Sequence, residues 1–161
     1  DNRLNMIHEG THGIQALDLL GRKVVMDGGK GLQLLAGKVN DTIQRALAVP
    51  ELAGFANELA AALAEVGRAT KAAWATGKPE EALANAVPYL QAFGHTVIAW
   101  IWLDVALCAQ AKLAQGDDAA LRGKLAACRF FYRHDLPKVA AWLQVVASRD
   151  DTCLAMSEDW F

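Results

Sequence analysis

Apolar residues recur at helical spacing in four long stretches of the chain, separated by short polar or glycine-containing turns. These stretches cover approximately residues 31–48, 50–77, 79–115 and 118–146. We find no alternation of apolar and polar residues long enough to predict a sheet. Because short connections between long helices favour antiparallel neighbours, the pattern predicts an all-α fold, an up-down antiparallel four-helix bundle.

Two prolines indicate where the predicted helices should bend. Pro88 should bend or split the third helix near its start. Pro137 cannot donate a hydrogen bond to the carbonyl of residue 133, so the fourth helix should kink near His134. Residues 151–161 are expected to form a loose tail, whose terminal aromatic residues could dock on the bundle or on another domain.

The third stretch contains the most hydrophobic run, residues 97–109. Its 13 residues fall short of the roughly 20 that cross a bilayer, and Asp104 interrupts them. We therefore expect no membrane span but a central bundle helix that is apolar nearly all round. A lone buried carboxylate is costly, so Asp104 should pair with a Lys or Arg on a neighbouring helix.

A shorter helix is predicted ahead of the bundle. Thr11 is a good N-cap residue, and the helical pattern that begins there continues to about Val25. Three glycines within residues 27–31 should end this helix in a flexible break. Gly-Gly-Lys-Gly matches neither a P-loop nor a dinucleotide fingerprint, so we interpret the break as a hinge.

The segment before this helix contains His8-Glu9-x-x-His12, which has the letters of a zinc-hydrolase motif. That motif requires both imidazoles on one helical face. Gly10 and Gly13 each cost about 1 kcal/mol within a helix, and a helix starting after Thr11 would separate the two imidazoles. We therefore assign no metal ligand, and a zinc hydrolase remains the less favoured hypothesis.

The longer stretch of residues 7–23 closely resembles the acyl-CoA dehydrogenase family, in particular its members with an additional C-terminal helical domain. The resemblance is carried by Glu9-Gly10-Thr11, by Ile14-Gln15-Ala16-Leu17-Asp18-Leu19 and by Gly21-Arg22-Lys23. It implies that residues 1–29 are the end of a catalytic domain and that residues 30–161 form the additional four-helix domain. His8 stands where tyrosine is commoner in the family.

The resemblance also implies a reaction and its site residues. Glu9 would be the base that removes the α-proton of an acyl-CoA while the β-hydride passes to FAD. The backbone N–H of Glu9 would help hold the thioester carbonyl, and Gly10 and Thr11 would lie near the flavin. Such a base must be desolvated, because removing a weakly acidic α-proton requires its pKa to rise towards the working pH. The nearby helix N-terminus has the opposite effect, because it stabilises the charged carboxylate and so lowers its pKa.

Composition limits the other possible functions. Hydrophobic residues make up 53% of the chain and the net charge is −2, so no basic stripe is present to bind nucleic acid. Cys108, Cys128 and Cys153 form neither a C-x-x-C pair nor an even framework. They suggest apolar fillers in a reducing cytoplasm, although one pair could bridge if the fold brings it together.

Two classes of function remain open. The first is the C-terminal part of an FAD-dependent acyl-CoA dehydrogenase of fatty-acid metabolism, which is inactive in isolation. Its partners would be an acyl-CoA, an electron-transfer acceptor, the remainder of the dehydrogenase chain and further copies in a homo-oligomer. The second is a non-catalytic helical module for interaction or oligomerisation. The first is preferred because the residues that resemble the family include its base.

Overall fold

The structure is a computed structural model that describes residues 11–160, and within them it contains helices and turns but no strand. The elements are α1 (Thr11–Asp18), the π-helix η2 (Leu19–Lys23), α2 (Met26–Leu47), α3 (Ala53–Ala73), α4 (Pro79–Leu83), α5 (Ala86–Leu113), α6 (Ala119–His134), α7 (Lys138–Ser148) and the 3-10 helix η3 (Glu158–Trp160). The all-α prediction is confirmed.

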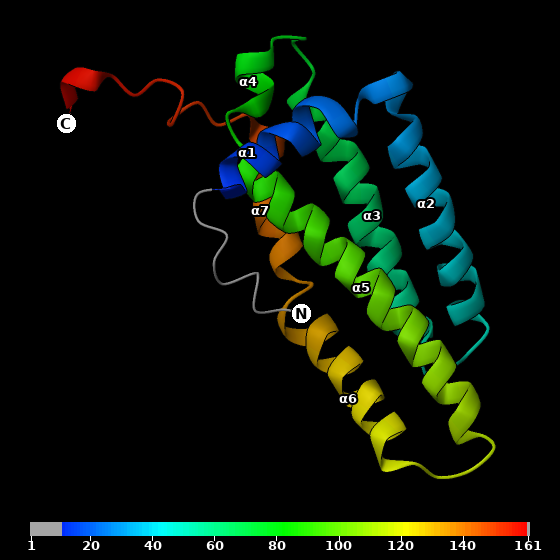
Figure 1. The fold of residues 1–161 in the computed structure, drawn as a ribbon. Helices are drawn as coiled ribbons and strands as arrows, with labels where there is room; N and C mark the ends of the chain where they lie inside the picture. Colours follow the sequence, from blue (N-terminus) through cyan, green and yellow to red (C-terminus); the bar gives the residue numbers. More distant parts are fainter. Residues whose placement is uncertain (1–10, 161) are drawn as a thin grey trace.

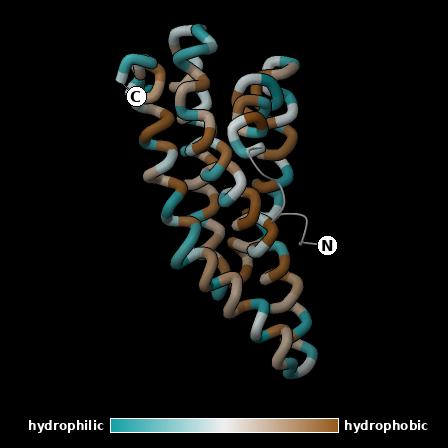
Figure 2. Tube along the Cα trace, turned by 60° about the vertical axis from the view of Figure 1, so that its left-hand side comes forward, coloured by the Kyte–Doolittle hydropathy of each residue, from teal (hydrophilic) through white to brown (hydrophobic). Residues whose placement is uncertain are grey.

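The long helices lie side by side, with α6 and α7 together forming the fourth member of the bundle (Figure 1). Successive members run in opposite directions, so the predicted up-down antiparallel bundle is confirmed. α5 is the central helix, because it packs against α1, α2, α3, α6 and α7. Hydrophilic residues gather at the turns at both ends of the bundle (Figure 2).

The fourth member is divided by the turn at residues 135–137. The N–H groups of Asp135 and Leu136 both donate to the Phe131 carbonyl at 2.9 Å, and α7 starts directly after Pro137. Proline has no N–H with which to continue the helical ladder. The expected kink is therefore present, as a complete break between α6 and α7.

The predicted third helix is also divided. α4 ends at Leu83, and Asn85 adopts φ −114° and ψ 33° before α5 begins. The side chain of Asn85 donates a 2.8 Å hydrogen bond to the Asp150 carbonyl, which ties this break to the end of α7. Pro88 then occupies the first turn of α5, where a missing N–H costs nothing. The split near the start of the helix is confirmed.

The buried face of α5 is one of several apolar faces that helical spacing allows. Leu90, Val97, Trp100 and Asp104 also lie at helical spacing, but they are only partly buried. The face in the core is made of Ala86, Tyr89, Ala92, Thr96, Ala99, Leu103, Ala106 and Ala109. Because α5 is apolar nearly all round, helical spacing alone cannot select one stripe. Alanines face the neighbouring helices because they allow close packing.

Buried polar side chains in the core have partners. The Tyr89 and Thr70 hydroxyl oxygens lie 2.7 Å apart, and the Tyr132 hydroxyl donates to the Ala99 carbonyl at 3.0 Å. Burial raises the pKa of Tyr89 to about 12 and the pKa of Tyr132 still further. Each tyrosine thus remains neutral and anchors two elements to each other.

By length and composition, α5 is the one helix among residues 11–160 that could cross a membrane. In the bundle it packs against α1, α2, α3, α6 and α7. Beyond α7, residues 151–160 form turns and the short helix η3, with mostly exposed side chains. Trp160 is 67% exposed and does not dock on the bundle, which agrees with the prediction of a loose tail.

Candidate active-site segment

Thr11 is the only predicted site residue that the structure describes. It is the first described residue of α1, and its side chain is half-buried, whereas the neighbouring His12 is exposed. Glu9, Gly10 and His8 lie outside the described residues. The predicted base and its neighbours therefore stay predictions, and the geometry of the segment is defined from Thr11 onwards.

The segment C-terminal to Thr11 is fixed firmly to the bundle. Ala16 and Leu20 are fully buried, and α1 packs against α5. The Trp74 indole Nε1 of α3 donates a 3.2 Å hydrogen bond to the Leu20 carbonyl. α5 thus holds α1 in place, and Trp74 of α3 holds the η2 turn that follows it.

A π-helix, η2, continues directly from α1. The Val24 N–H donates to the Leu19 carbonyl at 3.0 Å, a bond across five residues. Gly21 lies within this wide turn, where an added Cβ would be only 3.3 Å from the Leu83 side chain of α4. Single π-turns occur frequently at functional sites. The apolar pattern of the sequence did not indicate this turn, because π and α turns bury similar positions.

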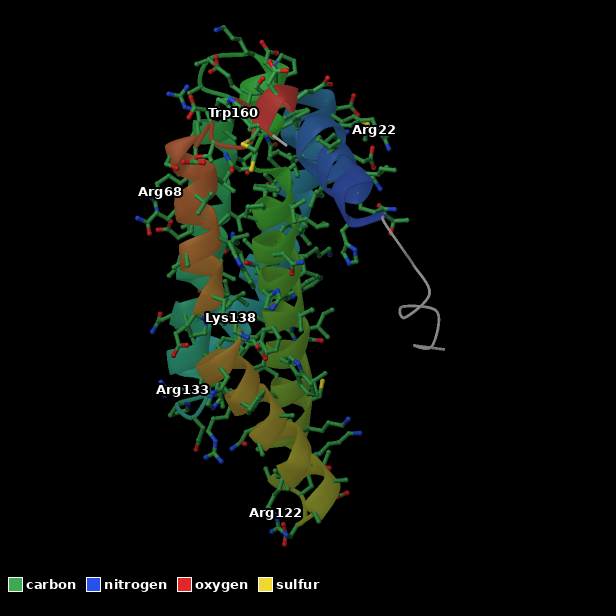
Figure 3. The ribbon with its side chains drawn as sticks, turned by 90° about the vertical axis from the view of Figure 1, so that its left-hand side faces the viewer. Arg22, Arg68, Arg122, Arg133, Lys138 and Trp160 are labelled. Carbon is green, nitrogen blue, oxygen red and sulfur yellow. The ribbon has the colours of Figure 1, made fainter. Side chains whose placement is uncertain are left out.

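Charged groups are paired on the exposed side of η2. The Arg22 guanidinium lies 2.6 Å from Asp18, and the Lys23 ammonium lies 3.6 Å from the same carboxylate. The hydrogen bond from Arg22 holds the pKa of Asp18 below its usual value. Figure 3 shows Arg22 at the same end of the bundle as Trp160, with Arg122 at the opposite end. The sequence motif contained these residues, but their pairing was not predicted.

The glycine-rich break lies where the sequence indicated it. Asp27, Gly28 and Gly29 have φ values of 51°, 66° and 81°, which interrupt the start of α2 with left-handed backbone. Glycine adopts this conformation without steric cost. The break is shorter than predicted, because Lys30 and Gly31 already belong to the regular part of α2.

Two cavities lie at opposite ends of the bundle. One of about 430 Å³ is bounded by η2, the start of α2 and Phe93, and one of about 370 Å³ is bounded by α3, α5 and α6. Thr11 lines neither cavity. A single threonine hydroxyl does not form a flavin site, so residues 11–160 do not by themselves fit FAD.

Within residues 11–160, no group of three or more His, Cys, Asp or Glu side chains lies close enough to hold a metal ion. The His95 ring packs against Phe131 and Trp142, and its Nδ1 lies 2.9 Å from the Gln91 carbonyl. His134 stacks on Phe130. His95 is thus a packing residue at the rim of the core, whereas His134 and Phe130 stack on each other at the surface.

The remaining predicted features can also be placed. Asp104 lies 2.6 Å from the Arg45 guanidinium of α2 and is half exposed, which confirms a partner on a neighbouring helix. Cys108 and Cys153 are exposed, Cys128 is buried, and all three are free. Burial raises the pKa of the Cys128 thiol to about 12, so this residue is an apolar filler rather than a nucleophile.

Comparison with known proteins gives relatives over the whole chain. A 3-methylmercaptopropionyl-CoA dehydrogenase of Ruegeria pomeroyi is 34% identical, and the alignment covers 98% of this chain and 27% of that protein. A butyryl-CoA dehydrogenase of Syntrophomonas wolfei is 30% identical over 100% of this chain and 27% of its own length. A broad-specificity linear acyl-CoA dehydrogenase of Mycobacterium tuberculosis is 26% identical, and the alignment covers 100% of this chain and 28% of that protein.

The chain thus spans about a quarter of the length of the curated relatives it matches. A family model described as acetyl-CoA dehydrogenase C-terminal like matches residues 35–157, which comprise nearly all of the bundle. These findings confirm the relationship that residues 7–23 suggested. The chain belongs to the acetyl-CoA dehydrogenase C-terminal-like family and corresponds to the C-terminal region of acyl-CoA dehydrogenases.

Proposed function

We propose that the chain acts as the C-terminal part of an FAD-dependent acyl-CoA dehydrogenase and supplies its catalytic base, Glu9. The observation that carries the proposal is the alignment of nearly the whole chain, including residues before the bundle, with proteins named as acyl-CoA dehydrogenases. The names of these relatives support acyl-CoA thioesters as the substrate class.

The chemistry assigned to this chain is proton transfer. The carboxylate of Glu9 removes the α-proton of the thioester, while its backbone N–H and other fixed donors stabilise the developing charge on the carbonyl oxygen. FAD, when bound, supplies the acceptor for the β-hydride. Glu9 precedes α1, which packs against α5, and the following η2 accepts a hydrogen bond from Trp74, so the helices after Glu9 provide a rigid base.

The remaining parts of the site belong, in this proposal, to a longer polypeptide. It would supply the flavin pocket and most of the acyl pocket, and residues 1–29 and 30–161 would be the catalytic end and the additional domain. We expect the isolated chain to be inactive and the whole enzyme to be a cytoplasmic homo-oligomer. An electron-transfer acceptor would reoxidise the flavin.

The test is the steady-state oxidation of acyl-CoA by the full-length dehydrogenase that contains this chain, with an artificial electron acceptor. Glu9→Gln keeps the shape of the side chain but removes its basicity, so kcat should fall at least about 100-fold. Glu158→Gln, at an exposed position of η3, is the matched control and should retain activity. Retained turnover in Glu9→Gln would reject the assignment.

Two further measurements separate the alternatives. The isolated chain should show no acyl-CoA oxidation even with FAD added, and activity there would contradict the need for other domains. Metal analysis of the purified protein tests the zinc hypothesis, which requires stoichiometric zinc.

A further inference from the structure

The cavity of about 370 Å³ at the end of the bundle opposite η2 has no role in the proposed reaction. It lies where the α5–α6 hairpin extends beyond the turn between α2 and α3 (Figure 1). The start of α3, the second half of α5 and one face of α6 line it. Small-molecule sites typically have volumes of about 300–1,000 Å³. The cavity is therefore large enough to hold a small ligand of its own.

The walls of this cavity are mostly apolar. The Phe55 ring on the α3 side packs against the Tyr132 ring of α6, with centroids 4.8 Å apart, so its position is fixed. The apolar lining residues are Leu52, Phe55, Ala106, Leu125, Ala126 and Cys128. Walls of this kind favour an aliphatic group, because each methylene removed from water contributes to the binding free energy.

α6 adds positive charge to the same cavity. Arg122, Leu125, Ala126 and Arg129 all line it, and their spacing of three and four residues places them on one face of the helix. An arginine thus lies at each end of the apolar part of this face. The whole of α6 carries three arginines and one lysine but no acidic residue. This distribution of charge favours an anionic ligand.

The two arginines differ in their partners. The Arg122 Nη1 lies 2.6 and 2.7 Å from the two carboxylate oxygens of Asp117, so this guanidinium is already paired. Among residues 11–160, no carboxylate lies within 4 Å of the Arg129 guanidinium. That includes Glu51, the one acid that lines the cavity. The donors of Arg129 are therefore available to a single anionic group.

A carboxylate is the anion that suits these donors. The planar guanidinium fork can donate to both carboxylate oxygens at once. The Gln110 side chain also lines the cavity, and its amide can donate a further hydrogen bond. A single negative charge is repelled less by Glu51 than the double charge of a phosphate monoester.

We propose that this cavity binds an unbranched aliphatic monocarboxylate. Its carboxylate pairs with Arg129, and its hydrocarbon chain lies against Leu52, Phe55 and Leu125. The site is separate from the candidate active-site segment and does not depend on Glu9 or on the proposed reaction.

The first test is isothermal titration calorimetry of the 161-residue chain with sodium octanoate. We expect one saturable site with a Kd of about 1 mM or tighter. From butanoate to octanoate, each added methylene should lower Kd about fourfold while the cavity still accommodates the chain. Octan-1-ol has no charge and octylammonium has the opposite charge, so both should bind at least about 10-fold more weakly than octanoate.

Variants of the charged residues test the position of the carboxylate. Arg129→Gln should weaken octanoate binding at least about 10-fold but leave the weak binding of octan-1-ol unchanged. Arg133→Gln is the matched control, because Arg133 is exposed on the same helix but does not line the cavity. Glu51→Gln removes a repulsive charge and should tighten octanoate binding.

A cavity-filling variant tests the position of the hydrocarbon chain. Ala126 is exposed and lines the cavity, so Ala126→Phe should block octanoate while keeping both the fold and Arg129. Ala111→Phe, at an exposed position of α5 outside the cavity, is its control and should bind octanoate as the wild type does.

The buried thiol of Cys128 supplies a second readout, since it also lines the cavity. In a chain with Cys108→Ser and Cys153→Ser, octanoate should slow alkylation of Cys128 by iodoacetamide. The concentration that gives half-maximal protection should match the calorimetric Kd. Octanoate that binds without protecting Cys128 would lie outside this cavity and would contradict the proposal.

Four other results would overturn the site. The absence of saturable binding at about 10 mM octanoate would reject it outright. Equal affinity of Arg129→Gln and the wild type would exclude the carboxylate contact, and unchanged binding in Ala126→Phe would place the ligand elsewhere. Tighter binding of octylammonium than of octanoate would make Glu51, rather than Arg129, the charged contact.

Discussion

The hydrogen bond between Thr70 of α3 and Tyr89 of α5 allows a specific prediction about how mutation of each residue changes stability. The Thr70 hydroxyl donates to the Val66 carbonyl at 2.7 Å, and its oxygen lies 2.7 Å from the Tyr89 hydroxyl oxygen. A threonine hydroxyl has one proton, and the carbonyl takes it. Tyr89 must therefore donate to Thr70, so the two partners lose different amounts when mutated.

The expected costs depend on which group remains unpaired. Tyr89→Phe removes one buried hydrogen bond and leaves Thr70 bonded to Val66, so it should cost about 1 kcal/mol. Thr70→Val leaves the Tyr89 hydroxyl buried without an acceptor and should cost about 2 kcal/mol. In the double variant no donor is left unpaired, so its cost should lie about 1–2 kcal/mol below the sum of the two single costs.

Urea and thermal unfolding monitored by circular dichroism measure these differences. For a chain of this length, about 2 kcal/mol corresponds to a fall in Tm of about 4–8 °C. Thr96→Val is the control, because Thr96 is buried but bonds only to the Ala92 carbonyl of its own helix. The control should change stability by less than about 0.5 kcal/mol. Additive costs, or Thr70→Val costing no more than Tyr89→Phe, would refute the direction of this bond.

Three further outcomes are expected. Gly28→Ala should lower the free energy of unfolding by about 1 kcal/mol, because φ is +66° there. Gly37→Ala, in the regular part of α2, should instead raise it by up to about 1 kcal/mol. Thermal unfolding measures both changes. Asp104→Asn should cost less than about 1 kcal/mol in urea unfolding, since its bond to Arg45 is exposed. Because burial raises the pKa of Tyr89 to about 12, the unfolded state loses this proton first, so Tyr89 alone should contribute a fall in stability of about 1.4 kcal/mol per pH unit between about pH 10 and 12. Unfolding curves across this range should be less steeply pH-dependent in Tyr89→Phe.

Much of the fold could be predicted because helix signals in this chain are local. Glycine at positions 28 and 29 and proline at 137 ended helices where the sequence indicated, since their backbone limits do not depend on tertiary contacts. The split of the third helix near its start was also expected, from Pro88. Its position at Asn85 was not, and the side chain of that residue bonds to Asp150, 65 residues away in sequence.

The buried face of α5 could not be predicted from periodicity, because contacts between residues distant in the sequence determine it. Almost every direction around this helix is apolar, so the contacts of Tyr89 with Thr70 and of Tyr132 with Ala99 decide which side faces inward. The candidate site was predicted from motif resemblance rather than from spacing. Its only described member, Thr11, lies at the start of α1, and the role of Glu9 stays a prediction.

The role of Glu9 is tested most directly by single-turnover reduction of the flavin by acyl-CoA in the full-length dehydrogenase containing this chain. This reaction observes proton and hydride removal without the later electron acceptor. We expect Glu9→Gln to bind FAD normally but to reduce it at least about 100-fold more slowly than the wild type, while Glu158→Gln reacts at the wild-type rate. Flavin reduction at the wild-type rate in Glu9→Gln would show that Glu9 is not the base.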